Sequence, residues 1–462
     1  MTANLKPMAS TKCQPDDSWF VDILDKIDAD ASGSSLSGSI FRFPQHFASL
    51  SPASYTPTML TVGPYTAKCA TEFHNDLNKY KLDVAREVRR KKGLTSSQLI
   101  ESIVPPNELP DIKGEYADEI ELDDTLFAQV VAVDALFVAG LLMILSDQSM
   151  PEGFGSLPVD RYNYVFAHDL FLLENQVPLR VLQRALMLLH GEDEEEALRK
   201  LIFGIQNLIV EARFFDENQI EDNVTDFDLS MKKLFRMHSE MRACKHILHC
   251  FYTAVTYGYK TEQPEPIYPS MMKVLGCSEL RRRGIKLEPV VGRISKVAFK
   301  PARFCSLSSS SRLYLPKLKM HEGTESLMRN LLAFELYTEK LKRVPIFASY
   351  VVLMSMLVDT VEDVQLMEKQ QLIDCLGGDA ESMRTLWKRV TIDTSIAILE
   401  RDDKILHAIS DASLSRYRRT IADIRRQTTA SVAIFISVLA AAIVIVATLL
   451  QTVYTIVGYY NA

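Results

Sequence analysis

The chain has 462 residues, a formal charge of -7 and an isoelectric point near 5.8. This acidic balance excludes a general nucleic-acid binder, which needs a basic surface to neutralise phosphates. The seven cysteines form an odd, scattered set, which is typical of reduced intracellular thiols rather than of a disulfide framework.

The N-terminal residues 1–36 are polar and rich in Ser, Asp and Gly, so we expect a flexible arm there. They contain no apolar stretch after a basic start, which argues against a secretory signal. Two short segments follow at residues 40–44 and 58–65, and each contains Pro or Gly-Pro near its end. We expect both segments to be extended.

Two helices are predicted next. Apolar residues recur every three or four positions over residues 72–92, which predicts an amphipathic helix that Gly93 ends. Residues 127–145 are very apolar, but Asp134 leaves an uninterrupted run of only 11 residues. Since a bilayer crossing needs about 20 apolar residues, this pattern predicts a buried helix.

The most distinctive string, HDLFLLENQVP, covers residues 168–178. Pro178 disfavours helix at the residue before it, which predicts a break with a new helix starting at Pro178 itself. Asn175 and Gln176 are then expected to satisfy orphan backbone groups at the break.

Two groups of side chains could carry chemistry. An acid/base set could be made by His168, Asp169 and Glu174, but no nucleophile motif or glycine turn accompanies it. A metal-like run is made by Cys244, His246, His249 and Cys250. One short run on a helical pattern cannot point all four side chains inward, so we expect a structural role for it.

The second half of the chain mixes strands and helices. Residues 231–259 are expected to be helical, and a proline-rich linker at residues 264–269 then marks a boundary. An alternating pattern from residue 286 to 320 predicts short strands at residues 297–299 and 313–315.

Helical patterns return after these strands. One helix is predicted over residues 325–341, and an apolar stripe from Tyr350 to Val364 predicts another. Thr360 and Asp363 have the spacing of a capping box, which would start a fresh helix within that stripe.

The C-terminal stretch is the longest apolar one. Residues 430–460 contain no charged residue or histidine, and we predict a transmembrane helix over residues 430–457. The upstream flank carries Arg416, Arg418, Arg419, Arg425 and Arg426, while nothing charged follows. The positive-inside rule therefore predicts a single-pass, tail-anchored protein whose bulk lies in the cytosol.

The predicted fold class is mainly α, with a multi-helix cytosolic body, a few short β-strands and one C-terminal transmembrane helix. Four parts are expected: a flexible arm (1–36), a helical part (37–262), a part with short strands and helices (263–429) and the transmembrane helix (430–457). Small residues at positions 433, 437 and 441 would allow close helix pairing in the bilayer, so a homo-oligomer is possible.

Five strings in the same order give the chain a resemblance to a plant family, the domain of unknown function 247 family, also called UPF0481. They are LTVGPYTAK (60–68), DLFLLENQVPLRVL (169–182), ELRRRGIKL (279–287), RNLLAFE (329–335) and QTVYTIVGYY (451–460). The positions that carry the resemblance in the body are Gly63, Pro64, Tyr65, Asp169, Glu174, Asn175, Gln176, Pro178, Glu279, Leu280, Gly284, Asn330, Phe334 and Glu335. One departure is clear, because the family's two histidines after Gly-Pro-Tyr are Thr66 and Ala67 here.

The resemblance implies a mostly helical, membrane-attached plant protein with no assigned reaction, and some grass relatives are linked to pollen–stigma self-incompatibility. We therefore expect a non-enzymatic, membrane-anchored interaction or recognition protein, at the plasma membrane or an endomembrane, with unknown protein partners. No phosphate loop, zinc signature or nucleophile elbow is present, and no cofactor is expected. Two alternatives stay open: an enzyme using the carboxylates of Asp169, Glu174 and Glu335, or a cell-surface receptor with its bulk outside.

Overall fold

The computed structural model describes the chain over residues 38–43, 51–67, 72–145, 154, 159–191, 193–212, 214, 241–259, 266–267, 275–290, 293–302, 310–338, 344–392, 398–414 and 432–460. The predicted N-terminal arm and the arginines Arg418, Arg419, Arg425 and Arg426 lie outside these residues.

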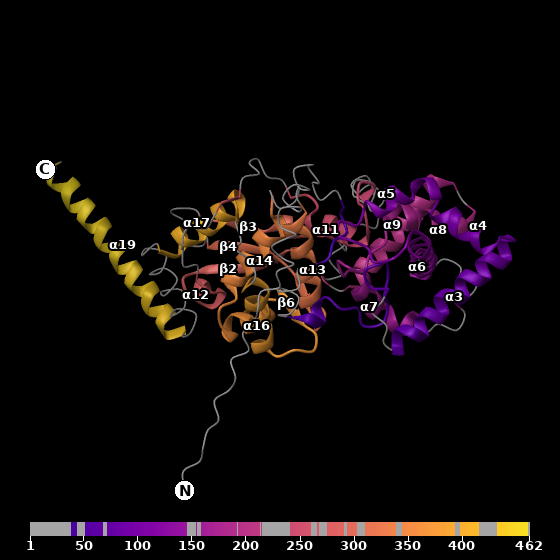
Figure 1. Cartoon of the computed structure of the whole chain (residues 1–462). Coiled ribbons are helices and arrows are strands. Elements are labelled where there is room, and N and C mark those ends of the chain that lie inside the picture. Colours follow the sequence, from indigo (N-terminus) through magenta and orange to yellow (C-terminus); the bar gives the residue numbers. More distant parts are fainter. Residues whose placement is uncertain are drawn as a thin grey trace, which may run out of the picture.

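The first half of the body is a group of helices around α6 (Figure 1). Its helices are α3 (Glu72–Lys92), α4 (Ser96–Ile103), α5 (Leu109–Lys113), α6 (Asp124–Ile144), α7 (Val159–Leu170), α8 (Leu179–His190), α9 (Glu194–Glu211) and α11 (Ile247–Thr256), with 3-10 turns η1 (Pro52–Ser54) and η2 (Pro106–Glu108). The helices α3, α4, α8 and α9 all pack against α6. The central helix is therefore surrounded by amphipathic neighbours.

Local signals explain where these helices begin and end. The helix predicted over residues 72–92 is confirmed as α3, and Gly93 follows it with a φ of +66°, a conformation that favours glycine. Helix α4 begins with a capping box in which the Thr95 and Gln98 side chains each bond the other residue's N–H. Asp123 caps α6 and Asp193 caps α9 in the same manner, by accepting a backbone N–H.

Helix α6 is buried, as its interrupted apolar pattern predicts. Its most apolar window has a mean hydropathy of 2.2 and is 72% buried inside the body. Phe127, Val131 and Leu136 along it are fully covered. An apolar helix of this length would also be long enough to cross a bilayer, but its neighbours here already cover it.

The second half combines short strands with helices. Its elements are β1 (Pro266–Ile267), α12 (Cys277–Arg282), β2 (Ile285–Val290), η4 (Ile294–Lys296), β3 (Ala298–Lys300), β4 (Ser311–Pro316), β5 (Leu318–Met320), α13 (Thr324–Tyr337), α14 (Ile346–Leu357), α15 (Val361–Lys369), β6 (Ile373–Cys375), α16 (Ala380–Ile392), β7 (Ile398–Leu399) and α17 (Glu400–Leu414). In the largest sheet β4 lies between β2, which is parallel to it, and β3, which is antiparallel. The pairs β1–β7 (antiparallel) and β5–β6 (parallel) complete the sheets of the described residues.

Several predictions of the second half are confirmed. The strands predicted at residues 297–299 and 313–315 correspond to β3 and β4. Thr360 and Asp363 form the predicted capping box, which separates α15 from α14. The helix predicted over residues 325–341 is α13, which ends at Tyr337.

Other predictions need correction. The helix expected over residues 231–259 is confirmed only over Ile247–Thr256 (α11) in its described part, because residues 242–246 before it are not helical. Pro178 precedes α8 as its N-cap instead of being its first residue. The segment expected to be extended at residues 58–65 pairs with no strand; side chains bond its N–H groups instead. The proline-rich stretch contributes β1, which pairs with β7 more than a hundred residues later.

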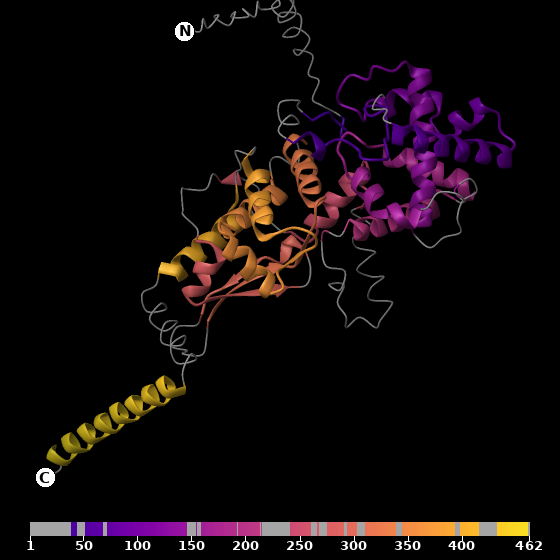
Figure 2. The ribbon, with the colours of Figure 1, turned by 90° about the horizontal axis from the view of Figure 1, so that it is seen from below.

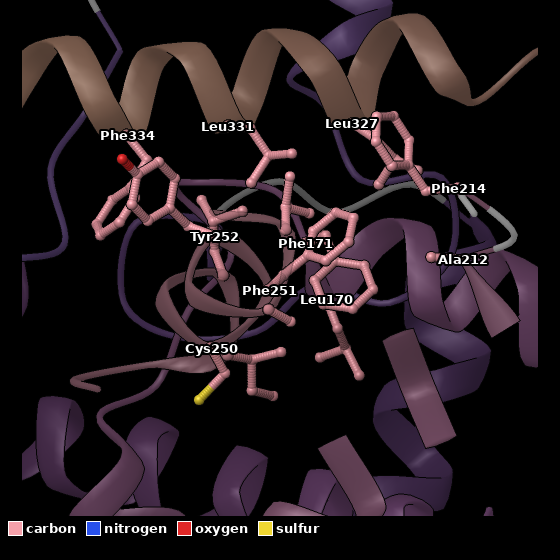
Figure 3. Packing of buried hydrophobic residues seen from close by; sticks show 14 of the residues in the cluster. Leu170, Phe171, Ala212, Phe214, Cys250, Phe251, Tyr252, Leu327, Leu331 and Phe334 are labelled. Carbon is pink, nitrogen blue, oxygen red and sulfur yellow. The ribbon is translucent and has the colours of Figure 1, made fainter. Parts of the chain in front are cut away.

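The apolar core extends from one half to the other without a gap. Figure 3 shows Leu327, Leu331 and Phe334 pointing from α13 into the region that holds Phe171, Phe251 and Tyr252, and the rings of Phe334 and Tyr252 lie 5.6 Å apart between their centroids. The rings of Phe171 and Phe251 lie 4.4 Å apart between their centroids. The end of α7 and helices α11 and α13 therefore join in one packed region.

Helix α19 (Val432–Tyr460) differs from all of these elements. It stands apart from the body in both views (Figures 1 and 2). Its window Leu439–Ile456 has a mean hydropathy of 2.1 and is 0% buried, and Val444, for example, is 63% exposed. The described residues thus contain two helices long and apolar enough to cross a membrane, α6 and α19, and only α6 is covered by protein.

Candidate functional site

The segment at residues 58–63 runs along the break between α7 and α8, and side chains hold its backbone. The Asp169 carboxylate accepts three hydrogen bonds, from the N–H groups of Thr58, Met59 and Leu60, each at 2.8 Å. Extended backbone without a neighbouring strand leaves N–H groups that need partners. Asp169, which is fully buried at the end of α7, supplies those partners. We call residues 58–63 and the side chains that bond them the polar junction.

Asn175 and Gln176 occupy the break as predicted. Asn175 accepts the Val62 N–H at 2.5 Å and donates to the Leu60 carbonyl at 2.8 Å. Gln176 donates from Nε2 to two carbonyls at the end of α7, those of Leu170 and Leu172, both at 2.7 Å. These carbonyls are the orphan acceptors that a helix leaves at its C-terminus. Both amide side chains are buried, so their bonds replace water.

Gly63 explains the Gly-Pro-Tyr string in steric terms. Its φ is +82°, and a Cβ built at this position would lie 2.4 Å from the Gln176 carbonyl oxygen. Its N–H donates to the Asp134 carboxylate at 2.8 Å. A residue with a side chain would be strained in this backbone conformation, and its Cβ would clash with the Gln176 carbonyl at the break between α7 and α8.

A buried ion pair completes the polar junction. Lys81 Nζ of α3 lies 2.6 Å from Asp134 Oδ1 of α6, and their side chains are only 5% and 8% exposed. The same ammonium donates to the Thr61 carbonyl at 2.5 Å. This pair was not predicted from the sequence. The available signal was the single Asp within an apolar helix, since a buried carboxylate requires a partner.

Tyr65 links the polar junction to the chain before α6. Its hydroxyl donates to the Asp118 carbonyl at 3.1 Å and accepts the Asp118 N–H at 2.9 Å. Its ring meets Tyr116 edge to face, with centroids 5.4 Å apart. Burial raises the pKa of Tyr65, so the phenol stays protonated at neutral pH.

The side chains of Glu174 and Asn330 also bond backbone groups of other segments. Glu174 accepts the Phe43 N–H at 2.8 Å, and burial raises its pKa although that bond opposes the shift. Asn330 of α13 accepts the Leu173 N–H and donates to the Ser54 carbonyl, both at 2.8 Å. Glu174 and Asn330 therefore attach two N-terminal segments to the break and to α13.

Glu335 lies apart from this set and serves another helix. Its carboxylate accepts the Tyr252 hydroxyl at 2.6 Å and the N–H groups of Phe347 and Ala348, each at 2.7 Å. These N–H groups open α14, whose own N-cap, Pro345, makes no side-chain cap bond. Burial raises the pKa of Glu335 to about 7, despite the hydrogen bonds that favour its charged form.

The third string of the resemblance forms a separate structure around α12. Leu280 is fully buried, the Glu279 carboxylate lies 2.8 Å from Arg283, and Gly284 turns the chain into β2 with a φ of +84°. Asp363 fixes the start of this helix by accepting the Ser278 N–H at 2.7 Å. Burial acts to raise the pKa of Asp363, but its hydrogen bonds outweigh that effect and lower it.

The predicted metal-like run is bonded within the protein. His246 caps α11 by accepting the His249 N–H at 3.3 Å, and its other ring nitrogen bonds the Ser39 carbonyl at 3.1 Å. His249 accepts the Lys245 N–H at 3.2 Å, and burial lowers its pKa to about 4. No group of three or more His, Cys, Asp or Glu residues within the described ranges could hold a metal ion.

The structure thus brings Gly63, Asp169, Asn175 and Gln176 together and leaves Glu335 and the α12 string elsewhere. The three carboxylates considered for an acid/base role each bond backbone N–H groups from other segments. A carboxylate in this position works as a fixed acceptor that orders loops and helix ends.

Comparison with known proteins agrees with the family resemblance of the five sequence strings. A family model described as a plant protein of unknown function, DUF247, matches residues 40–447. Among curated relatives, two UPF0481 proteins of Arabidopsis thaliana are similar to this chain. At3g02645 is 22% identical over 479 residues, covering 87% of each chain. At3g47200 is 23% identical over 435 residues, covering 91% of this chain and 87% of the relative.

No solved structure gave a significant match. The family model nevertheless spans most of the described body, including the polar junction and the α12 string, and ends inside α19. The chain therefore belongs to the domain of unknown function 247 family of plant proteins, whose curated relatives carry the name UPF0481.

Proposed function

We propose that this protein is a membrane-anchored, non-enzymatic interaction protein whose body serves recognition at a membrane surface. The observation that carries the proposal is the exposure of α19. An apolar helix of this length is stable only when an apolar phase or another protein surface covers it. The body leaves it uncovered, whereas it covers α6, which has nearly the same mean hydropathy.

The bonding of the carboxylates supports a scaffold more than an active site. Asp169, Glu174 and Glu335 direct their oxygens at backbone N–H groups of other segments. They also belong to separate sets of contacts, since Glu335 bonds Tyr252 and α14 instead of the polar junction. An acid/base pair would need two such groups facing one substrate position.

A cytosolic body is the orientation we propose. The arginine-rich flank before α19 favours it by the positive-inside rule. Cys244, Cys250, Cys277 and Cys375, the cysteines of the described residues, are all free thiols, which fits a reducing compartment. Anchoring would concentrate the body at one surface, so modest contacts with a protein partner could suffice.

Membrane topology is the experiment that tests this function. Vesicles carrying the full chain are treated with alkaline carbonate, then with protease from the outer (cytosolic) side, and with a glycosidase that reports sugar on Asn223. This residue begins the glycosylation acceptor Asn223-Val224-Thr225, which would be modified only in the lumen. We expect the protein to resist carbonate extraction, its body to be digested, and no glycosidase shift to occur. A matched chain without residues 432–462 should be released by carbonate.

The alternatives give different results in the same assay. A body that is protected from protease and carries sugar on Asn223 would overturn the cytosolic orientation and favour a cell-surface receptor. Release of the full chain by carbonate would overturn the membrane anchor.

A further inference from the structure

The three-stranded sheet carries an unusual row of cations on its outer face. The strand register places Lys286 of β2 opposite Arg312 of β4, and Arg312 opposite Lys300 of β3. All three side chains are exposed, while the alternating neighbours Leu287 and Leu313 face the core. Because adjacent strands are about 4.8 Å apart, the row is about 10 Å wide.

The row places three like charges opposite one another across the strands. Like charges directly opposite each other on a sheet are destabilising. Compensation within the protein is centred on Arg312, because the Tyr314 side chain and Glu288, 3.4 Å away, raise its pKa. Lys300 lies 5.0 Å from the centre of the Tyr314 ring. Glu288 also shares the outer face with Lys286, two positions along β2, so the strands present three cations and one carboxylate on that face.

The sequence around the sheet is equally one-sided. Residues 285–320 contain eight Lys or Arg residues and a single acidic residue, Glu288, in a chain whose total charge is -7. With eight basic residues and one acidic residue, this segment carries a net charge of +7 in an acidic protein. This distribution is typical of a surface that attracts an anionic partner.

The position of this sheet points to one partner. Helix α17 is the last described element before α19; it packs against β3, and the Ser413 carbonyl near its end accepts a hydrogen bond from Arg283 at 3.3 Å. Residues 415–431 connect α17 to α19, so their extended length limits the distance from the end of α17 to the anchor to about 60 Å. Strands β2, β3 and β4, which carry the row, lie in the half of the body nearer to α19 (Figures 1 and 2).

We propose that the row of Lys286, Arg312 and Lys300 docks on anionic phospholipid headgroups of the membrane that α19 anchors. This inference rests on the proposed function, because it requires the anchor. Lys and Arg near an anionic leaflet are attracted to it, and tethering raises the effective concentration of the lipid surface. Docking would fix the orientation of the body and so determine which of its faces a cytosolic partner can reach.

A second basic cluster provides an internal control. Arg89, Arg90, Lys91 and Lys92 end α3, at the far end of the body from α19 (Figure 1). Their position is explained by favourable charge at a helix C-terminus, without an external partner.

The test uses the full-length protein in nanodiscs of phosphatidylcholine alone or mixed with phosphatidylserine. Exposed lysines are acetylated by an amine-reactive ester, and the rate at each lysine is followed by mass spectrometry. We expect Lys286, Lys296 and Lys300 to react several-fold more slowly in the anionic discs, and Lys92 to react equally in both. High salt should remove the difference by screening.

Two matched variants distinguish docking by this row from a general effect of positive charge. Lys286→Gln, Lys300→Gln and Arg312→Gln combined should abolish the protection of Lys296. Arg89→Gln, Lys91→Gln and Lys92→Gln combined, which removes the same charge at the far end, should leave Lys286 protected. Circular dichroism of both variants checks that they fold.

The outcomes distinguish this inference from the membrane anchor. Co-elution of the protein with both discs but equal lysine reactivity in them would overturn the docking and leave the anchor intact. Failure to co-elute with either disc would overturn the anchor and the docking together. If Lys286 and Lys300 react equally slowly in both discs, and much more slowly than Lys92, another molecule such as a second copy covers the face, which would also overturn lipid docking.

Discussion

The Asp169 carboxylate accepts N–H groups that lie about 110 positions earlier in the chain, and this long-range bonding recurs at other single residues. Asn175 reaches Leu60, and Gly63 bonds Asp134. Buried hydrogen bonds of this kind are worth little individually when they are made, but leaving one partner unsatisfied is costly. Substitution at the polar junction should therefore affect stability strongly, even where no reacting group is present.

Gly63→Ala tests the steric part of this view. The variant would place a Cβ 2.4 Å from the Gln176 carbonyl and force a side chain into a positive φ. We expect the free energy of unfolding to fall by about 2–4 kcal/mol, from backbone strain and local overpacking together. Urea unfolding of the detergent-solubilised protein, followed by circular dichroism, measures this change.

Gly93→Ala is the matched control for this substitution. Gly93 also has a positive φ, +66°, but nothing lies within 4 Å of a Cβ built there. Only the conformational cost of about 1 kcal/mol should remain. Equal losses for the two variants would mean that the contact with Gln176 contributes nothing.

At the scale of elements, the first turn of helix α14 is capped by a carboxylate from a different helix. Glu335 of α13 bonds the N–H groups of Phe347 and Ala348, and burial raises its pKa to about 7. The native state then binds a proton more tightly than the unfolded chain does, so protonation of Glu335 adds to the free energy of unfolding. This stabilisation is complete at low pH and is lost as the pH rises from about 4.5 through about 7.

Glu335→Gln should remove this pH dependence. Relative to the variant, the wild-type protein should lose on the order of 2 kcal/mol of unfolding free energy between about pH 5 and about pH 8. Urea unfolding at a series of pH values measures the slope, whatever the absolute stability of the variant. Glu381→Gln, on the exposed surface of α16, should keep the wild-type slope. Parallel curves for wild type and Glu335→Gln would contradict the raised pKa.

Element boundaries were predictable where a local signal such as a capping box or a terminal glycine marks them. The helix at residues 72–92 follows from its periodicity and Gly93, and the start of α15 follows from Thr360 and Asp363. The pairing of β1 with β7 and the parallel pairing of β2 with β4 depend on residues far apart in sequence, where no local signal exists.

The polar junction was predictable only in part, for the same reason. The proline at 178 and the two preceding amides indicate a break whose backbone groups need partners, and that expectation is confirmed. The extended pattern at residues 58–65 could not reveal that Asp169 and Asn175 would replace a neighbouring strand. Nor does the sequence show that Lys81 of α3 reaches Asp134, since two separate helices must first pack.

At the scale of the whole molecule, the described residues form a body with a continuous apolar core and a helix outside it. The core links α6, α13 and α14, so the body should unfold cooperatively. The described side chains of α19 contribute nothing to this core. The proposed anchor depends on that independence, because a helix that packed against the body would need no membrane.

Removal of residues 432–462 tests this independence. We expect the shortened chain to be soluble without detergent and to unfold at the same urea concentration as the full chain in detergent. The reason is that stability scales with apolar surface buried on folding, and the described side chains of α19 bury none against the body.

Introducing Gly63→Ala into the shortened chain should lower its midpoint, which verifies that the measurement detects a loss in the body. A lower midpoint after removal of α19 alone, or loss of the cooperative transition, would mean that α19 packs against the body. The exposure that supports a membrane anchor would then disappear.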